Sequence, residues 1–173
     1  MKENVIIVNC KVPSEAFQIL SKLRQDVDDE NLEISQAAVV KKEAGRLTLE
    51  DSFIDGDSVD DRSWTGSLIG SLVGVLAGPL GVLLGGGIGS LIGDSMDEKA
   101  LTEKSELLEK ACECLVDGET ALLVLAQEEN ENALEDKLKE FQVSITRLDA
   151  GEVASEIKQE IERAEAKEAE KDD

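Results

Sequence analysis

Residues 63–93 form an uncharged segment inside a 173-residue chain whose formal net charge is -21. Glycine recurs in it every four residues and the period restarts after Pro79, which places glycines at Gly66, Gly70, Gly74, Gly78, Gly81, Gly85, Gly89 and Gly93. A four-residue period puts each set of four along one stripe of an α-helix. Glycine costs about 1 kcal/mol relative to alanine at a solvated helix position, so such helices need another main chain packed against the stripe. The uncharged segment therefore predicts close helix packing away from water, with these eight glycines as the packing and oligomerisation residues.

The other residues of the uncharged segment are mainly Leu, Ile and Val, and they cover the rest of the helix circumference. A helix that is apolar all round is typical of lipid or of the interior of an assembly. Trp64 stands at the start, where a membrane-interface anchor is expected. One helix of this length would reach about 46 Å, too long for a hydrocarbon core of about 30 Å, and Pro79 disrupts its middle. We therefore expect a helical hairpin over residues 63–95 with its turn at Pro79.

The uncharged segment has three other interpretations. A flexible linker would be polar rather than rich in Leu, Ile and Val. A nucleotide-binding loop at residues 85–90 lacks the third glycine, which is replaced by Ser90, and follows no predicted strand. A dry core shared by several copies of a water-soluble protein remains open beside lipid contact.

The segments on either side of the hairpin show the periodicities of strands and amphipathic helices. Ser14 is expected to cap a helix that begins near Glu15, and Gly45 is expected to supply the positive φ of a hairpin turn. Strands are predicted at residues 5–10, 34–42, 46–53, 121–127 and 141–149, and helices at residues 15–25, 95–116, around 133–138, and 151–173.

The order strand, helix, strand occurs once before the uncharged segment and once after it. Two such units predict an α+β fold, a ferredoxin-like split β-α-β sandwich with the glycine-zipper hairpin inserted. The expected parts are the first half (1–62), the hairpin (63–95), the second half (96–149) and a charged C-terminal helix or tail (150–173). One face of such a sheet has no helices of its own, so we expect a second copy to cover it.

The C-terminal segment is rich in Glu, Lys and Ala and carries only a thin apolar stripe. The stripe consists of Val153, Ile157, Ile161 and Ala164. A stripe this thin predicts a solvated helix that frays toward its end.

Composition excludes several classes of function. The strong negative charge argues against a nucleic-acid partner, and the absence of histidine removes the commonest general base and metal ligand. Cys10, Cys112 and Cys114 are expected to be small buried residues in a reducing compartment, and only Cys10 is considered as a nucleophile. The acidic residues 55–61 do not match the spacing of a calcium loop. We expect no enzyme, and no catalytic, cofactor-binding or metal-binding residue.

The chain resembles a bacterial and archaeal family, domain of unknown function 1269, in which a glycine-zipper hairpin interrupts a small ferredoxin-like domain. The segments that carry the resemblance are VIIVNC (5–10), ISQAAVVKKEAGRLTLED (34–51), SLIGSLVGVLAGPLGVLLGGGIGSLIGD (67–94) and LVDGETALLVLAQE (115–128). The resemblance implies membrane association and no assigned activity. This sequence departs from the family pattern in its acidic residues 55–61 and in its long charged tail.

Together these patterns predict a non-catalytic homo-oligomer whose partners are other copies of itself and a lipid bilayer. It is expected at the cell membrane with its bulk facing the cytoplasm. A pore-like or membrane-remodelling role would follow if several hairpins closed a ring. The alternative is a cytoplasmic, soluble oligomer that serves as a regulatory or ligand-binding module and buries the hairpin between protomers.

Overall fold

The computed structural model describes residues 2–26, 29–54, 67–78 and 106–171, and these form a mixed α+β fold. The strands are β1 (Lys2–Cys10), β2 (Leu32–Glu43), β3 (Arg46–Ile54), β4 (Thr120–Glu128) and β5 (Val143–Asp149). The helices within the described residues are α1 (Pro13–Gln25), α3 (Leu68–Ala77), α6 (Glu106–Cys114), α7 (Asn132–Lys137) and α8 (Ala150–Lys171). All five strands predicted from the sequence are present, each within a few residues of its expected bounds.

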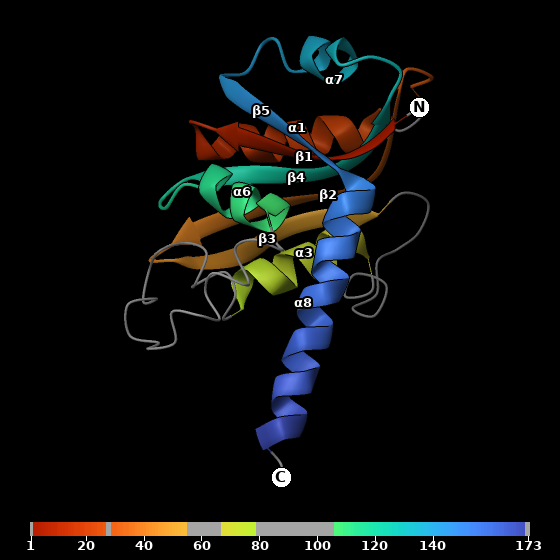
Figure 1. The fold of residues 1–173 in the computed structure, drawn as a ribbon. Helices are drawn as coiled ribbons and strands as arrows, with labels where there is room; N and C mark the ends of the chain where they lie inside the picture. Colours follow the sequence, from red (N-terminus) through yellow and green to blue (C-terminus); the bar gives the residue numbers. More distant parts are fainter. Residues whose placement is uncertain (1, 27–28, 55–66, 79–105, 172–173) are drawn as a thin grey trace.

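The five strands form one antiparallel sheet in the order β3-β2-β4-β1-β5 (Figure 1). β4 and β1 lie inside the sheet, and their apolar runs are buried on both faces, as continuous runs predict. The turn between β2 and β3 has Ala44 at φ 50° and Gly45 at φ 76°, so the expected positive φ at Gly45 is confirmed.

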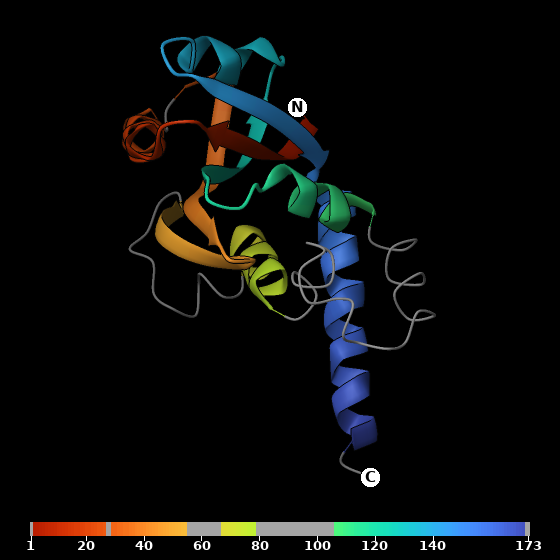
Figure 2. The same ribbon diagram turned by 90° about the vertical axis from the view of Figure 1, so that its left-hand side faces the viewer.

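Helices cover both faces of the sheet. α1 and α7 pack on one face, over side chains such as Ile6 and Val124. α3, α6 and α8 pack on the other, over Ile7 and Leu123, and Figure 2 shows the two groups on opposite sides of the strands. The expectation of a bare face waiting for a second copy is therefore wrong. The chain covers that face itself, because α3 and α8 each carry apolar side chains that the sheet can bury.

Two local expectations need correction. α1 begins at Pro13 rather than near Glu15, and its N-cap is Val12, which makes no side-chain cap, rather than Ser14. Proline suits the first helical position because its φ is already helical and the missing N–H has no partner there. The helix thus starts on proline geometry instead of a serine hydroxyl.

α8 is only partly the solvated helix that its thin stripe predicts. Val153 and Ile157 are buried in the core, whereas Ile161 is 43% exposed and Ala164 is exposed. Figures 1 and 2 show the C-terminal half of α8 extending beyond the rest of the described fold. The first half of the helix is therefore a core element, and only the second half is solvated.

Candidate functional site: the groove between α3 and α8

α3 is the described part of the uncharged segment, and it packs against the sheet of its own chain. Ile69, Leu72, Val73 and Leu76 are buried, and α3 contacts β2, β3 and β4. The helix ends at Ala77, immediately before Gly78 and Pro79, as the sequence predicts. Burial in the protein's own core is an arrangement that the sequence interpretation did not include.

Two polar side chains fix the N-terminus of α3. The Ser67 hydroxyl accepts a hydrogen bond from the Gly70 amide at 3.0 Å, and Oε1 of Gln36 accepts one from the Ile69 amide at 2.9 Å. Gln36 belongs to β2, so this bond ties the helix to the sheet. A glutamine directly before the apolar residues 37–40 of β2 was the sequence signal for this contact. The first amides of a helix lack partners within it, so both bonds satisfy groups that would otherwise need water.

The described glycines of α3 lie in different surroundings. Gly70 is buried, Gly74 is exposed and Gly78 is half-buried. A Cβ placed on Gly74 would have no heavy atom of the described residues within 4 Å, apart from its own helix turn. Within the described residues, no second main chain packs against Gly74. The other predicted site residues, Trp64, Gly66, Pro79, Gly81, Gly85, Gly89 and Gly93, lie outside the described residues.

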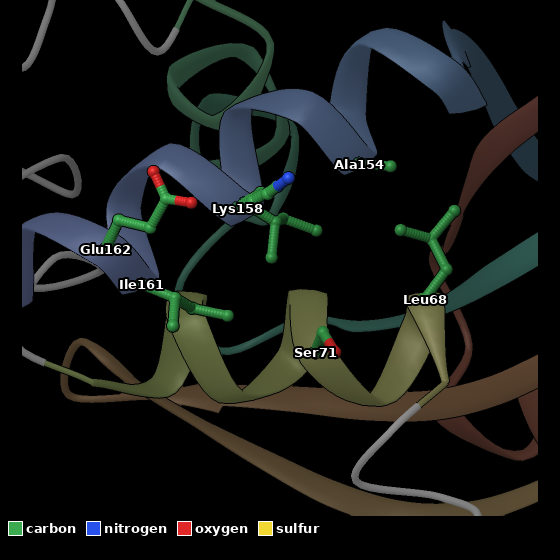
Figure 3. A pocket seen from close by; sticks show the side chains of 7 residues that line it. Leu68, Ser71, Ala154, Lys158, Ile161 and Glu162 are labelled. Atoms are coloured by element: carbon green, nitrogen blue, oxygen red, sulfur yellow. The ribbon is translucent and has the colours of Figure 1, made fainter. Parts of the chain in front are cut away.

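A groove of about 440 Å³ separates α3 from α8 (Figure 3). Leu68 and Ser71 of α3 form one wall, and Ala154, Ile157, Lys158, Ile161 and Glu162 of α8 form the other. Figure 3 shows Leu68 and Ala154 facing each other across the space. The two helices are therefore neighbours whose apolar side chains do not close the gap between them.

Glu156 links α8 to α6. Its Oε1 accepts hydrogen bonds from the amides of Leu107 at 2.9 Å and Leu108 at 3.4 Å, and its Oε2 lies 3.2 Å from the Leu107 amide. These amides belong to the first turn of α6, where a carboxylate is favoured by the helix dipole. Burial nevertheless raises the pKa of Glu156, helped by the nearby charges of Glu106 and Glu152, while the two amides oppose the shift.

Asp149 stabilises the start of α8. Its Oδ1 accepts a hydrogen bond from the Glu152 amide at 2.9 Å, and Oδ2 lies 3.5 Å from Nζ of Lys2. The bond from Glu152 is the main reason that the pKa of Asp149 lies below its usual value, and Lys2 adds to the effect. The junction between β5 and α8 is therefore held by a capping carboxylate on the last strand residue.

An ion-pair network lies near the same end of the sheet, where Glu128 of β4 is paired with Lys2 of β1. Nε of Arg147 is 2.8 Å from Oε2 of Glu128, whose side chain is almost fully buried, and Nη1 is 3.2 Å from Oε1 of Glu135. Arg147 also donates to the Glu131 carbonyl, and the Leu134 amide donates to Glu128. These bonds tie β5 to β4 and to the start of α7, which is a structural role.

The thiols of Cys10 and Cys112 are not activated. Cys10 and Cys112 are buried and Cys114 is half-buried. Burial, with a contribution from Glu15, raises the pKa of Cys10 to about 11, and burial also raises the pKa of Cys112. At neutral pH both thiols are protonated and weakly nucleophilic. Among the described residues, no group of three or more His, Cys, Asp or Glu side chains is placed to hold a metal ion.

The fold and groove define a small α+β protein whose antiparallel sheet carries helices on both faces. The model of the family described as "Protein of unknown function (DUF1269)" matches residues 63–164, more than half of the chain. The chain belongs to this family, and the predicted family resemblance is confirmed. No significant match to a curated protein or to a solved structure was found. Of the helices that the structure describes, none is long and apolar enough to cross a bilayer.

Proposed function

We propose that this is a non-catalytic, membrane-associated protein that assembles with copies of itself through residues 63–95. The observation that carries the proposal is the two-sided character of α3. One side, with Ile69 and Leu72, packs on the sheet, and the opposite side presents Gly74 to open space. A charge-free helix with a flat outer side is suited to direct contact with another helix in a dry environment.

We further propose that β2, β4, β1 and β5, with α1 and α7, form a ferredoxin-like unit. The support is their order in the sheet and the placement of α1 and α7 on the same face. In this scheme β3 is an added edge strand, and residues 55–105 are an insertion. The bulk of the protein would then be a cytoplasmic body that carries the membrane-active hairpin.

Vesicle flotation combined with a mass measurement in solution tests the proposal. We expect the protein to float with phosphatidylcholine vesicles and to form larger particles in their presence. Gly74→Leu should prevent close approach of a second helix and leave the particles small. Ser155→Leu, which introduces the same side chain at an exposed site of α8, is the matched control. Unchanged particle size in Gly74→Leu, or a monomer that never floats, would count against the proposal.

The second candidate is a soluble oligomer that serves as a regulatory or ligand-binding module. It is favoured by the complete burial of Ile69 and Leu72 within one chain, because α3 then needs no lipid to cover its apolar side. A defined oligomer in plain buffer that ignores vesicles is the result that selects this candidate. Loss of that oligomer in Gly74→Leu would place the same helix at the protomer contact.

A further inference from the structure

The position of α8 bears directly on whether α3 can leave the sheet. α8 follows β5 without a loop, contacts α3, α6 and β1, and is the last element of the described chain. Moving α8 would break no strand pairing, because α8 is a helix that follows all five strands of the described sheet. A terminal helix can therefore move as a unit while the sheet stays intact.

Few apolar groups hold α8 in place. Ala150, Val153 and Ile157 enter the core, but Ile161, one turn further, is 43% exposed. The groove lined by Leu68, Ile157 and Ile161 leaves the contact with α3 incompletely packed. Open space beside apolar side chains forfeits part of the contact energy that a closed interface would supply.

The polar attachment of α8 to α6 runs through Glu156. The Glu156 carboxylate is half-buried and accepts the amides of Leu107 and Leu108, so it satisfies the start of α6 at the cost of losing water. The helix carries seven glutamates against four basic residues, which adds repulsion among like charges. Because its contact with α3 is incompletely packed and Glu156 attaches it to α6, α8 has the properties of an element that opens before the rest of the fold.

We propose that α8 is a displaceable strap that keeps α3 docked on the sheet, and that its release makes the apolar side of α3 available to a lipid surface. The strap and its movement follow from the contacts of α8, whereas the lipid destination rests on the proposed function. While α8 is docked, Leu72 and Ile69 remain buried and α3 is withheld. When α8 leaves, the sheet alone holds the helix.

The test joins α3 to α8 through a reducible bis-maleimide. Cysteines replace Ser71 and Lys158, which stand on opposite walls of the groove (Figure 3), in a Cys114→Ser background. The matched control carries Ala154→Cys and Lys158→Cys, so that the same reagent bridges one turn of α8 without reaching α3. Hydrogen exchange of residues 69–77 is compared with that of β4 before and after the linker is cleaved, with no lipid present.

If α8 is a strap, the cross-link slows exchange of α3 at least about tenfold relative to β4, and cleavage restores the rate. Glu156→Ala should speed exchange of α3 selectively, whereas Glu165→Ala, at an exposed site on the same helix, should not. Exchange of α3 that is unaffected by both the cross-link and Glu156→Ala would overturn the strap.

Vesicle flotation of the same cross-linked protein separates the strap from the proposed function. Flotation that is lost on cross-linking and regained on cleavage supports both. If the cross-link slows hydrogen exchange of α3 but the protein floats neither before nor after cleavage, the strap is supported and the membrane role is overturned. Flotation that is equal with and without the α3–α8 link would overturn the claim that α8 withholds α3 from lipid.

Discussion

Replacing Leu72 with alanine measures whether α3 belongs to the folded core. Leu72 is 0% exposed and lies in a cluster with Ile7 of β1 and Leu123 of β4. Removing a buried leucine side chain costs about 2–5 kcal/mol, since the lost transfer free energy adds to the cavity that remains. Domains of this size are stable by only about 5–15 kcal/mol. Leu72→Ala is therefore expected to remove a large fraction of the stability.

Urea unfolding followed by far-ultraviolet circular dichroism supplies the measurement. With a slope of about 2 kcal/mol per molar urea, a loss of about 3 kcal/mol lowers the midpoint by about 1.5 M. Val75→Ala is the matched control, because Val75 is only half-buried at the edge of the same core cluster and its truncation should cost much less. A Leu72→Ala midpoint within experimental error of the wild type would refute the docking of α3 on the sheet.

The remaining predictions concern single side chains around the same elements. Gly74→Ala should raise the free energy of unfolding by about 0.5–1 kcal/mol, because alanine is the better helix former and no described residue obstructs its Cβ. A loss of stability in urea unfolding would mean that another group packs against Gly74. The raised pKa of Glu156 means that the folded protein holds this proton more tightly than the unfolded chain. The contribution of Glu156 to stability is therefore greatest below its ordinary pKa of 4.5 and falls as the pH rises through the shifted pKa. As the pH rises from about 4 to about 7, the free energy of unfolding of Glu156→Gln should therefore increase relative to that of the wild type, as measured by urea unfolding. A difference between the two proteins that stays constant over this pH range would contradict the prediction. Maleimide should label Cys114 before Cys10 and Cys112 in the native protein, as followed by mass spectrometry, and equal rates for all three would contradict their burial.

The strands were predictable because each is a local pattern of apolar residues bounded by turn residues. β4 and β1 show continuous apolar runs, and Gly45 marks the hairpin between β2 and β3. The end of α3 at Ala77 was also readable, because Pro79 opposes helix just beyond it. These features depend only on residues that are close together in the chain, so they can be predicted from the sequence.

The contacts of the candidate site were not predictable from neighbours. Periodicity indicates that an apolar face will be buried, but lipid, a second copy and the chain's own sheet satisfy that requirement equally. The bond from Ile69 to Gln36 joins residues 33 positions apart, and the bond from Leu107 to Glu156 spans 49. Contacts of this kind arise only when distant segments meet in the fold.

By itself the sequence determined an acidic α+β chain with an uncharged, glycine-spaced segment and five recognisable strands. Tertiary structure decided that α3 covers the chain's own sheet, that the first half of α8 is a core element, and that Glu156 joins α8 to α6. The physical reason is that hydrophobic burial is non-directional. The hydrophobic effect depends on how much apolar surface leaves water, and only the packing of the whole chain selects which apolar surfaces contact each other.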